Sequence, residues 1–492
     1  MFRRFTNLAA VHFVGIGGAG MSGIAEVLLD YDLEVSGCDQ SMSETTDRLS
    51  KLGATIHQGH SPEHVERVDL VVISSAVSRD NPEVVAAKQN NITVVRRAEM
   101  LGELMRLKYG IAVAGTHGKT TTTSLIGTVM TEAGLDPTVI VGGRLRVSGT
   151  GARLGKSEYL VAEADEYDRS FLRLQPIVAV VTSIDEDHLD TYASLDEIRS
   201  AFVTFAAKVP FFGQAILCLD DANIQELLPQ MKREHRVLTY GLSPQADLRA
   251  TEFESTASGS RFDVVDSRSG ELGSVELPMP GLHNVRNSLA AIAVGQAMGI
   301  PFTSIAKALA GFSGVHRRFE TRGVWRGAKV IDDYAHHPTE VTATLEAARQ
   351  AFPGAVIHAV FQPHLFSRTR HLALEFGRSL LGADKAVVTD IYPSREQPEP
   401  GVTSELVIDA AKRSGHRDVR LCGDWRDVPP MLAEDVREGD VIPTLGAGDI
   451  YRLAEHLVEV AAAGLRATSR PRARARSAAG DSSHRIGAAA RC

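Results

Sequence analysis

The sequence has few cysteines and no long apolar run, and both absences narrow the kinds of protein it can encode. Its four cysteines, Cys38, Cys218, Cys422 and Cys492, are scattered along 492 residues and form no CxxC pair. This spacing excludes a disulfide framework and a Cys-based zinc site, and it fits a reducing compartment. No apolar run approaches the roughly 18 residues of a membrane-spanning helix, and the first residues lack the apolar segment of a secretory signal. We therefore expect a cytoplasmic protein without membrane insertion.

The sequence also lacks an excess of basic residues. It has 53 Lys and Arg against 61 Asp and Glu, a formal net charge of -8, which argues against nucleic-acid binding as the main activity. Hydrophobic residues make up 43% and charged residues 23%, as in ordinary globular proteins. A chain of 492 residues is too long for one hydrophobic core, so we expect several domains.

Short apolar runs alternate with longer amphipathic stretches, a pattern typical of βαβ units and parallel sheets. The runs predicted as strands are 11–16, 34–38, 70–73, 111–114, 159–162, 177–181, 215–219, 355–361 and 386–390. Helices are predicted after the first and fourth of these strands, at 23–29 and 121–133. Residues 246–277 alternate and are rich in Ser, Thr and Gly, which predicts antiparallel strands added to a parallel sheet.

Changes of pattern divide the chain into segments 1–108, 109–317, 318–465 and 466–492. The last segment carries seven Arg against one Asp and has no periodic apolar face. We expect it to be a disordered tail. Weak electrostatic contact of this tail with an anionic partner is the alternative.

A first glycine loop, Gly15-Ile-Gly-Gly-Ala-Gly20, follows the first predicted strand, and Asp39 ends the next one. This is the G-x-G-x-x-G pattern in its usual context, a strand, a tight turn and the N-terminus of a helix. Such a loop binds a diphosphate, because its backbone N–H groups and the helix dipole face the anion. NAD and a UDP-sugar both fit, and glycines that only permit tight packing are the structural alternative.

A second glycine loop, Gly115-Thr-His-Gly-Lys-Thr-Thr121, follows the strand at 111–114. It has the features of a P-loop, in which backbone N–H groups bind phosphates. In such a loop Lys119 would contact the transferred phosphate and Thr120 would bind Mg²⁺. It is shorter than a Walker A motif, since Val113 stands where the first glycine would fall. A chance glycine turn before a helix is the alternative.

Two acidic clusters follow later strands, at 163–168 and at 185–190. Ligands of α/β sheets bind at the carboxyl ends of strands, and Mg²⁺ prefers oxygen ligands. The sequence therefore predicts magnesium-holding carboxylates beside the second loop, although most of these acids belong to a solvated surface.

Eight motifs in order resemble the Mur ligase family, in particular its alanine-adding branch, over roughly residues 10–455. They are HFVGIGGAGMSG at 12–23, GTHGKT at 115–120, EADE at 163–166, DHLDTY at 187–192, GLHN at 281–284, DDYAHHP at 332–338, FQPH at 361–364 and LGAGD at 445–449. The resemblance implies an α/β fold of three domains: a Rossmann-like domain for the UDP-linked substrate, a central P-loop-type ATPase domain with a mixed sheet, and a Rossmann-like C-terminal domain that closes over the site. It also implies ATP and Mg²⁺ as cofactors, UDP-N-acetylmuramate and L-alanine as substrates, and a monomer or weak homodimer.

The implied reaction is ATP-dependent ligation of L-alanine to the substrate's lactyl carboxylate through an acyl phosphate, a step of peptidoglycan precursor synthesis. The residues implied in catalysis are Lys119, His188 and Arg368, and those implied to hold magnesium are Thr120, Glu163 and His188. The residues implied to bind ATP are Gly115, Thr116, His117, Gly118, Lys119, Thr120, Thr121, Asn284, Asn287 and Arg317. The residues implied to bind the UDP-linked substrate are Gly15, Gly17, Gly18, Ala19, Gly20, Asp39, Ser74, His336, His337 and His364.

Structural alternatives exist for several of these residues. Asn284 could be a helix N-cap, Arg317 an interdomain ion pair, and His336 and His337 turn residues before a proline. The sequence also departs from the family pattern at Leu365, a position that is often Arg, and at Tyr167 and Ala335, where Ser and Gly are frequent. Without a cation at position 365, contacts with the substrate carboxylate or the phosphate would depend on Arg368 or Arg370.

Three rival functions stay open at this level. An NAD-dependent oxidoreductase would use the first loop but leaves the second unexplained, and a non-catalytic UDP-sugar sensor would keep the fold alone. A murein-tripeptide-recycling ligase shares nearly every motif, but its first loop usually reads Gly-Ile-Cys-Gly-Thr where this chain has Gly-Ile-Gly-Gly-Ala. Residues 198–206 also contain no Lys, where sister ligases carry a carbamylated one. Both features favour the alanine-adding branch.

Overall fold

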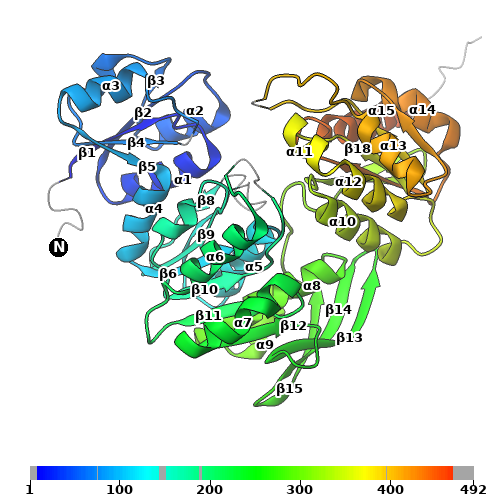
Figure 1. The fold of residues 1–492 in the computed structure, drawn as a ribbon, viewed down its shortest axis with the longest axis horizontal. Helices are drawn as coiled ribbons and strands as arrows, with labels where there is room; N and C mark the ends of the chain where they lie inside the picture. The colour runs from blue at the N-terminus through cyan, green and yellow to red at the C-terminus, as the bar shows by residue number, and fades with distance from the viewer. Residues whose placement is uncertain (1–7, 75, 143–150, 188–190, 395, 469–492) are drawn as a thin grey trace, which may run out of the picture.

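Three sheets, each flanked by helices, form the chain in a computed structural model that describes residues 8–74, 76–142, 151–187, 191–394 and 396–468. The N-terminal and C-terminal parts stand apart from each other on the same side of the central part (Figure 1). The α/β class and the three-part arrangement expected from the sequence are confirmed.

The N-terminal part is a five-stranded parallel sheet in the order β3-β2-β1-β4-β5. Its elements are β1 (Ala10–Val14), α1 (Ala19–Asp30), β2 (Glu34–Asp39), α2 (Glu44–Lys51), β3 (Thr55–Gln58), the 3₁₀ turn η1 (Pro62–Val65), β4 (Leu70–Ile73), α3 (Pro82–Gln89), β5 (Thr93–Arg96) and α4 (Arg97–Arg106). The strand order reverses between β1 and β4, and ligands of open α/β sheets bind beyond the strand ends at such a reversal. The first glycine loop lies at this point.

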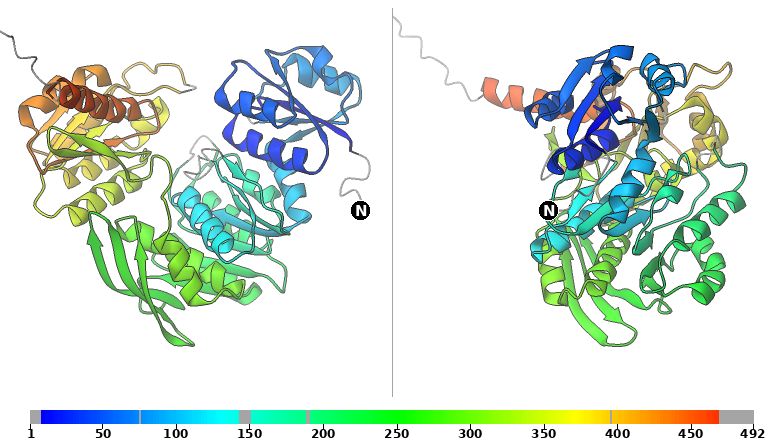
Figure 2. Two further views of the ribbon diagram at one scale, coloured as in Figure 1. Left: turned by 180° about the vertical axis from the view of Figure 1, so that it is seen from behind. Right: turned by 90° about the vertical axis from the view of Figure 1, so that its left-hand side faces the viewer.

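The central part is a ten-stranded mixed sheet in the order β15-β14-β13-β12-β11-β10-β6-β9-β7-β8. Its strands are β6 (Tyr109–Ala114), β7 (Thr138–Ile140), β8 (Ala152–Arg153), β9 (Tyr159–Glu163), β10 (Val178–Val181), β11 (Gln214–Cys218), β12 (Val237–Gly241), β13 (Leu248–Thr256), β14 (Gly259–Asp266) and β15 (Gly270–Leu277). Its helices are α5 (Lys119–Glu132), α6 (Leu195–Ala206), α7 (Ala222–Glu234), α8 (Leu282–Ala297) and α9 (Phe302–Ala310). The antiparallel strands predicted within 246–277 are confirmed as β13–β15, and Figure 2 shows them projecting beneath the C-terminal part.

The C-terminal part is a six-stranded sheet in the order β16-β17-β21-β18-β19-β20, parallel except for the β16–β17 pair. Its strands are β16 (Glu320–Trp325), β17 (Ala328–Asp333), β18 (His358–Phe361), β19 (Lys385–Val388), β20 (Val419–Leu421) and β21 (Val441–Leu445). Its helices are α10 (Pro338–Ala351), α11 (Phe366–His371), α12 (Ala373–Ser379), α13 (Glu405–Arg413), α14 (Val428–Asp435) and α15 (Tyr451–Thr468). Helix α15 thus continues three residues into the segment expected to be a tail, because its first turns are anchored by buried Leu453 and Leu457.

Buried apolar strands organise the cores. The residues of β6 and β10 are almost all buried, as expected for parallel strands covered on both faces. One continuous hydrophobic cluster joins the N-terminal and central parts, whereas the C-terminal sheet has separate clusters on its two faces. Helix α1 packs on β8, so that a methyl group added at Gly23 would lie 3.0 Å from Ala152 Cβ.

The predicted strands agree with observed ones, with ends that differ by a few residues. None of the helices within the described residues is long and apolar enough to cross a membrane. The proposed division of the chain at residues 108 and 317 falls in the connections that precede β6 and β16, and we retain it as a proposal.

Candidate active site

The second glycine loop connects buried strand β6 to helix α5, which begins at Lys119. The loop is held against the residues after β10: Thr116 N donates to the Ser183 carbonyl (3.0 Å) and His117 N to Ser183 Oγ (3.0 Å). Gly118 has φ +80°, a left-handed conformation that favours glycine. This geometry directs the N-terminus of α5 toward a cavity, as required for phosphate binding.

Lys119 lies in this cavity beside a carboxylate. Its Nζ donates to Glu166 Oε2 (2.7 Å) and to the Gly115 carbonyl (2.6 Å). Burial lowers the pKa of Lys119, but the carboxylates of Glu166, Asp165 and Glu163 outweigh it and raise the pKa above its usual value. The side chain is therefore a fixed positive charge at the mouth of the loop.

Thr120 and Glu163 form an oxygen pair next to this lysine. Thr120 Oγ1 donates to Glu163 Oε2 (3.0 Å), and Gly142 N donates to the same oxygen (2.7 Å). Burial raises the pKa of the Glu163 carboxyl, so an added cation would stabilise its ionised form. A hydroxyl and a carboxylate facing a phosphate loop fit Mg²⁺. His188, the third expected ligand, lies outside the described residues.

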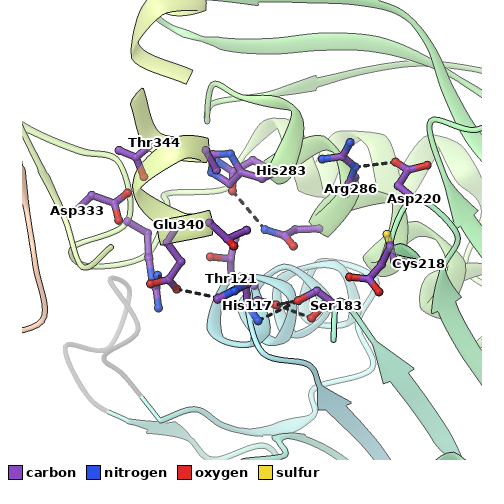
Figure 3. A pocket seen from close by; sticks show the side chains of 18 of the residues that line it. His117, Thr121, Ser183, Cys218, Asp220, His283, Arg286, Asp333, Glu340 and Thr344 are labelled. Atoms are coloured by element: carbon purple, nitrogen blue, oxygen red, sulfur yellow. Dashed lines mark hydrogen bonds and ion pairs between the residues drawn. The ribbon is translucent and has the colours of Figure 1, made fainter. Parts of the chain in front are cut away.

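Two adjacent cavities bring the predicted residues together. The larger, about 680 Å³, lies between the central and C-terminal parts. Predicted residues that line it are Thr116, His117, Gly118, Lys119, Thr120, Glu163, Arg317, His336 and His337. The smaller, about 270 Å³, is shown in Figure 3 and is lined by the predicted residues His117, Gly118, Thr121, Asn284 and Asn287.

Asn284 and Asn287 are buried on α8 and face the second loop. Asn284 Nδ2 donates to the Pro280 carbonyl (2.9 Å), and Asn287 Oδ1 accepts from Thr122 Oγ1 (3.2 Å). The N-cap of α8 is Gly281, so Asn284 does not cap the helix and that alternative is wrong.

Arg317 lies in the connection between the central and C-terminal parts, and its side chain contacts residues of the C-terminal part. Its guanidinium pairs with Asp332 (3.1 Å), donates to the Gly446 carbonyl (2.6 Å), and lies over the rings of Tyr334 and Tyr451 at 5.1 and 4.8 Å. With the chain divided after residue 317, this ion pair joins the last residue of the central segment to β17, so the alternative of an interdomain ion pair stays open.

Polar contacts join α10 to the second loop. His117 Nε2 lies 3.0 Å from Asp185, and its Nδ1 lies 3.6 Å from Glu340 on α10. Thr339 Oγ1 donates to Asp185 (2.6 Å), and Figure 3 shows His117 and Glu340 pointing toward each other. Burial lowers the pKa of His117, but the hydrogen bonds to Asp185 and Glu340 outweigh it and raise the pKa to about 9. The protonated ring thus connects the two parts.

The two C-terminal histidines differ in their surroundings. His337 is the N-cap of α10, accepts from Thr339 N (3.4 Å) and donates through Nε2 to the Glu186 carbonyl (3.2 Å). Burial and the nearby charge of His117 lower its pKa to about 4. His336 pairs with Glu340 at 3.0 Å. His337 therefore has the turn role given above as the structural alternative, and it also lines the larger cavity.

Beyond the cavities, Arg368 on α11 donates through Nη2 to Asp187 at 2.7 and 3.0 Å. His364, after β18, lies with its ring centroid 6.0 Å from that of His336 and stacks on Tyr392 with an interplanar angle of 11°.

The first glycine loop lies apart from both cavities, and no described residue of the N-terminal part lines either one. Gly17 N donates to Asp39 Oδ2 (3.0 Å), which holds Asp39 against the loop. Ser74 follows β4 and is half-buried. The first glycine loop and the two cavities therefore lie in separate regions of the described structure.

Comparisons with known proteins identify the family of the chain. The models of the Mur ligase family match residues 10–109 (catalytic domain), 113–295 (middle domain) and 317–448 (glutamate ligase domain). The chain belongs to the Mur ligase family. Curated relatives named UDP-N-acetylmuramate–L-alanine ligase include one from Trichlorobacter lovleyi, 51% identical over 92% of this chain and 99% of the relative, and one from Salinibacter ruber, 52% identical over 92% and 95%.

Solved structures give the same result for the fold. A UDP-N-acetylmuramate–alanine ligase from Thermotoga maritima superposes with a TM-score of 0.76 at 29% identity, over 92% of this chain and 99% of that one. A murein peptide ligase from Psychrobacter arcticus shares the fold with a TM-score of 0.64 at 24% identity, over 92% and 98%.

Several residues of this Mur ligase site escaped sequence reasoning. Glu340 contacts His117 and His336 and pairs with Arg318 at 3.3 Å. The available signal was an acid in the first turn of a helix that begins at the proline after His336 and His337. Arg97, at the start of α4, lies against the first loop, so that a methyl group added at Gly20 would be 2.8 Å from its Nη1. Arg97 also lies 3.7 Å from Asp165 of the central part.

The departure from the Mur ligase pattern at Leu365 has a structural outcome. Leu365 is buried and has φ +70°. Of the two nearby arginines, Arg370 pairs with Glu399 at the surface, whereas Arg368 reaches Asp187 in the strand-end cluster of the central part. Of the two arginines, Arg368 is therefore the one that pairs with a residue lining the larger cavity.

Proposed function

We propose that this chain joins L-alanine to the lactyl carboxylate of UDP-N-acetylmuramate, consuming ATP and releasing ADP and phosphate, in peptidoglycan precursor synthesis. The observation that carries the proposal is the larger cavity, where Lys119, Thr120 and Glu163 face Arg317, His336 and His337 across two parts of the molecule. Relatives with this activity in their names are 50–52% identical over more than 90% of the chain.

The chemistry needs two anions to meet and little covalent help. A lactyl carboxylate oxygen attacks the γ-phosphorus of ATP, ADP leaves, and an acyl phosphate forms. The alanine amine then attacks the acyl carbon, and the tetrahedral intermediate loses phosphate and a proton to give the amide. Positive charge that is already in place supplies most of the stabilisation in such steps.

Each predicted residue has a place in this scheme. Lys119 holds the transferred phosphate, and Arg368 and the histidines His336, His337 and His364 face the muramoyl group and the acyl phosphate. Thr120 and Glu163, with His188, would hold Mg²⁺, which would neutralise part of the negative charge of the phosphates. Asn284, Asn287 and Arg317 would contact the nucleotide.

The first loop would take the diphosphate of the UDP-linked substrate. Gly15, Gly17, Gly18, Ala19 and Gly20 provide the backbone, and Asp39 and Ser74 flank the ends of β2 and β4. We place the protein in the cytoplasm, where ATP and UDP-linked precursors are found, and the monomer or weak homodimer expected from the resemblance stays a prediction.

The test is a phosphate-release assay on the full chain with ATP, Mg²⁺ and UDP-N-acetylmuramate. Release should become strong only when L-alanine is added, and Lys119→Ala should lower kcat by about 100-fold or more. Lys412→Ala, at an exposed lysine of α13, is the matched control and should keep full activity. Far better use of the tripeptide L-Ala-D-Glu-diaminopimelate, an NAD-dependent absorbance change, or no ATP cleavage at all would each contradict the proposal.

A further inference from the structure

A buried cluster of His, Cys and Glu side chains lies in the N-terminal part, away from the two cavities. His12 comes from β1, Cys38 from β2 and Glu83 from α3, and all three side chains are fully buried. Their ligand-type atoms lie within 4.8 Å of one another. His60, after β3, and His64, on η1, approach the same carboxylate.

The polar atoms of these side chains lie close together around the Glu83 carboxylate. Cys38 Sγ lies 2.9 Å from Glu83 Oε2 and 3.2 Å from His60 Nδ1. His60 Nδ1 lies 3.0 Å from the same Glu83 oxygen. His64 Nδ1 lies 2.6 Å from the other Glu83 oxygen, and its ring stacks on His57 with centroids 4.1 Å apart.

One atom of the cluster has no hydrogen-bond partner. His12 Nε2 is buried and points at Glu83 Oε1 from 3.5 Å, while the other ring nitrogen, Nδ1, bonds Ser36 Oγ at 2.9 Å. Hydrogen-bonding Nδ1 to a protein oxygen is how a metal-binding histidine is commonly oriented. Among the described residues, the only polar contact of this buried nitrogen is therefore the 3.5 Å approach to a carboxylate, and a buried polar atom with so weak a contact is stabilised by a bound ligand.

We propose that His12 Nε2, Cys38 Sγ, His60 Nδ1 and one oxygen of Glu83 form a binding site for a divalent transition metal, with Zn²⁺ as its ion. Imidazole, thiolate and carboxylate are the ligands of Zn²⁺, at about 2.0–2.3 Å from the metal. Tetrahedral ligand atoms at that radius lie roughly 3.3–3.8 Å apart, so the Cys38, His60 and Glu83 atoms, now 2.9–3.2 Å apart, would move slightly outward to make room for the ion. Mg²⁺ does not suit this set, because it prefers oxygen alone.

Metal binding replaces hydrogen bonds that the cluster now makes. The Cys38 thiol donates to Glu83, and Zn²⁺ binds the thiolate, so the thiol proton leaves to solvent as the Zn–S bond forms. His64 keeps the second Glu83 oxygen. The ion thereby ties β1, β2, α3 and the turn after β3 together inside a small apolar cluster that includes Val14, Val65 and Val71.

The site also touches the first glycine loop through the backbone. The Cys38 carbonyl accepts from Gly15 N (2.8 Å) and Ile16 N (3.0 Å). A metal on Cys38 would therefore hold the strand end that carries this loop. The absence of CxxC pairs excluded a Cys-based zinc site, but spacing gives no warning of a mixed site whose ligands come from separate elements.

The test uses the full chain with Cys492→Ser, which removes the cysteine that lies outside the described residues, and without any nucleotide or substrate. One equivalent of Co²⁺ should give a thiolate-to-cobalt charge-transfer band in the near ultraviolet, and one equivalent of Zn²⁺ should remove it. Adding Cys38→Ser should abolish the band, and His60→Asn, at a partly exposed ligand, should weaken Zn²⁺ binding about tenfold or more. Cys218→Ser, at a buried cysteine of the central part, is the matched control and should keep the band.

Two results would overturn the proposal. One is the absence of any thiolate–cobalt band in the folded protein, and the other is an unchanged band in Cys38→Ser. Circular dichroism checks that each variant is folded, and the His60→Asn variant tests the site should Cys38→Ser fail to fold. The readout does not use ligase activity, so it stands whether or not the proposed function holds.

Discussion

At the scale of single residues, two neighbouring arginines illustrate what position decides. Arg368 and Arg370 lie on the same helix, but the Arg368 side chain is 9% exposed and pairs with Asp187. Arg370 is 47% exposed and pairs with Glu399. Surface ion pairs contribute little, whereas a buried charge-assisted pair at a site is strongly felt when one partner is removed.

We therefore expect Arg368→Ala to lower kcat/KM for UDP-N-acetylmuramate by about 10- to 100-fold, because a hydrogen bond to a charged group is worth about 1.5–3 kcal/mol. Arg370→Ala, the matched control, should change it less than about threefold. Steady-state kinetics at saturating ATP and L-alanine would show this. If both variants kept the kcat/KM of the wild type, neither arginine would serve the reaction.

Single residues also mark the limit of sequence reasoning. The common position of Lys119, Thr120 and Glu163 at one cavity could be predicted, because each lies at or beyond the carboxyl end of a strand in the same sheet. The Arg368–Asp187 pair joins residues 181 positions apart in two parts of the chain. No local pattern encodes such a pair, since it depends on how the parts dock.

At the scale of elements, the turn between β6 and α5 depends on backbone conformation as much as on side chains. Gly118 has φ +80°, and a methyl group there would lie 2.6 Å from Asn287 Oδ1. Gly354, after α10, has the same φ of +80° but open space around it. A comparison of alanine substitutions at the two glycines therefore separates the effect of backbone strain from that of steric collision.

Both Gly118→Ala and Gly354→Ala should lose about 1 kcal/mol of unfolding free energy from the left-handed backbone. Only Gly118→Ala should also lower kcat, by at least about tenfold, because its methyl group displaces the Asn287 side chain from the loop. Denaturant titration and phosphate release measure the two effects. A normal kcat in Gly118→Ala would show that the loop tolerates the displacement.

Several elements with a strong apolar pattern were predicted, although the buried strands β17 and β21 were not. The buried strands β6 and β10 were predicted from continuous apolar residues, and β13–β15 from alternation. The two-residue strand β8 was not, because its pairing with β7 comes from its neighbours and not from its own sequence. The cluster around Glu83 was not predicted either, because its side chains come from separate elements that only the fold brings together.

At the scale of the whole molecule, the three parts are joined in two different ways. The N-terminal and central parts share one hydrophobic cluster. The contacts described above between the central and C-terminal parts are polar, and they pair His117 with Glu340, Asp185 with Thr339, and Asp187 with Arg368. Charged groups therefore contribute to this second junction, so its stability should respond to pH.

The pH response follows from His117. Its pKa is about 9 in the folded protein against an ordinary value of 6.5, because Asp185 and Glu340 face it. Its stabilising contribution is therefore complete below about pH 6.5 and is lost as the pH rises through about 9. His337, with a pKa of about 4, stays neutral throughout this range.

We expect the thermal unfolding midpoint of the wild type to fall more steeply between pH 6.5 and 9.5 than that of His117→Gln. Below pH 6.5, His117 should cause no difference between the two proteins in how the unfolding midpoint changes with pH. Scanning calorimetry across the range would measure both slopes. Parallel curves for the two proteins would show that the histidine is not the titrating link between the parts.

Each sheet is built from one unbroken stretch of chain. Strands β1–β5 come from residues 10–96, β6–β15 from 109–277 and β16–β21 from 320–445, and no described strand enters the sheet of another part. On a ribosome, each sheet can therefore form as soon as its own stretch has emerged, the N-terminal one first. The ligase site needs residues from both sides of the last junction, so it is assembled only near the end of synthesis.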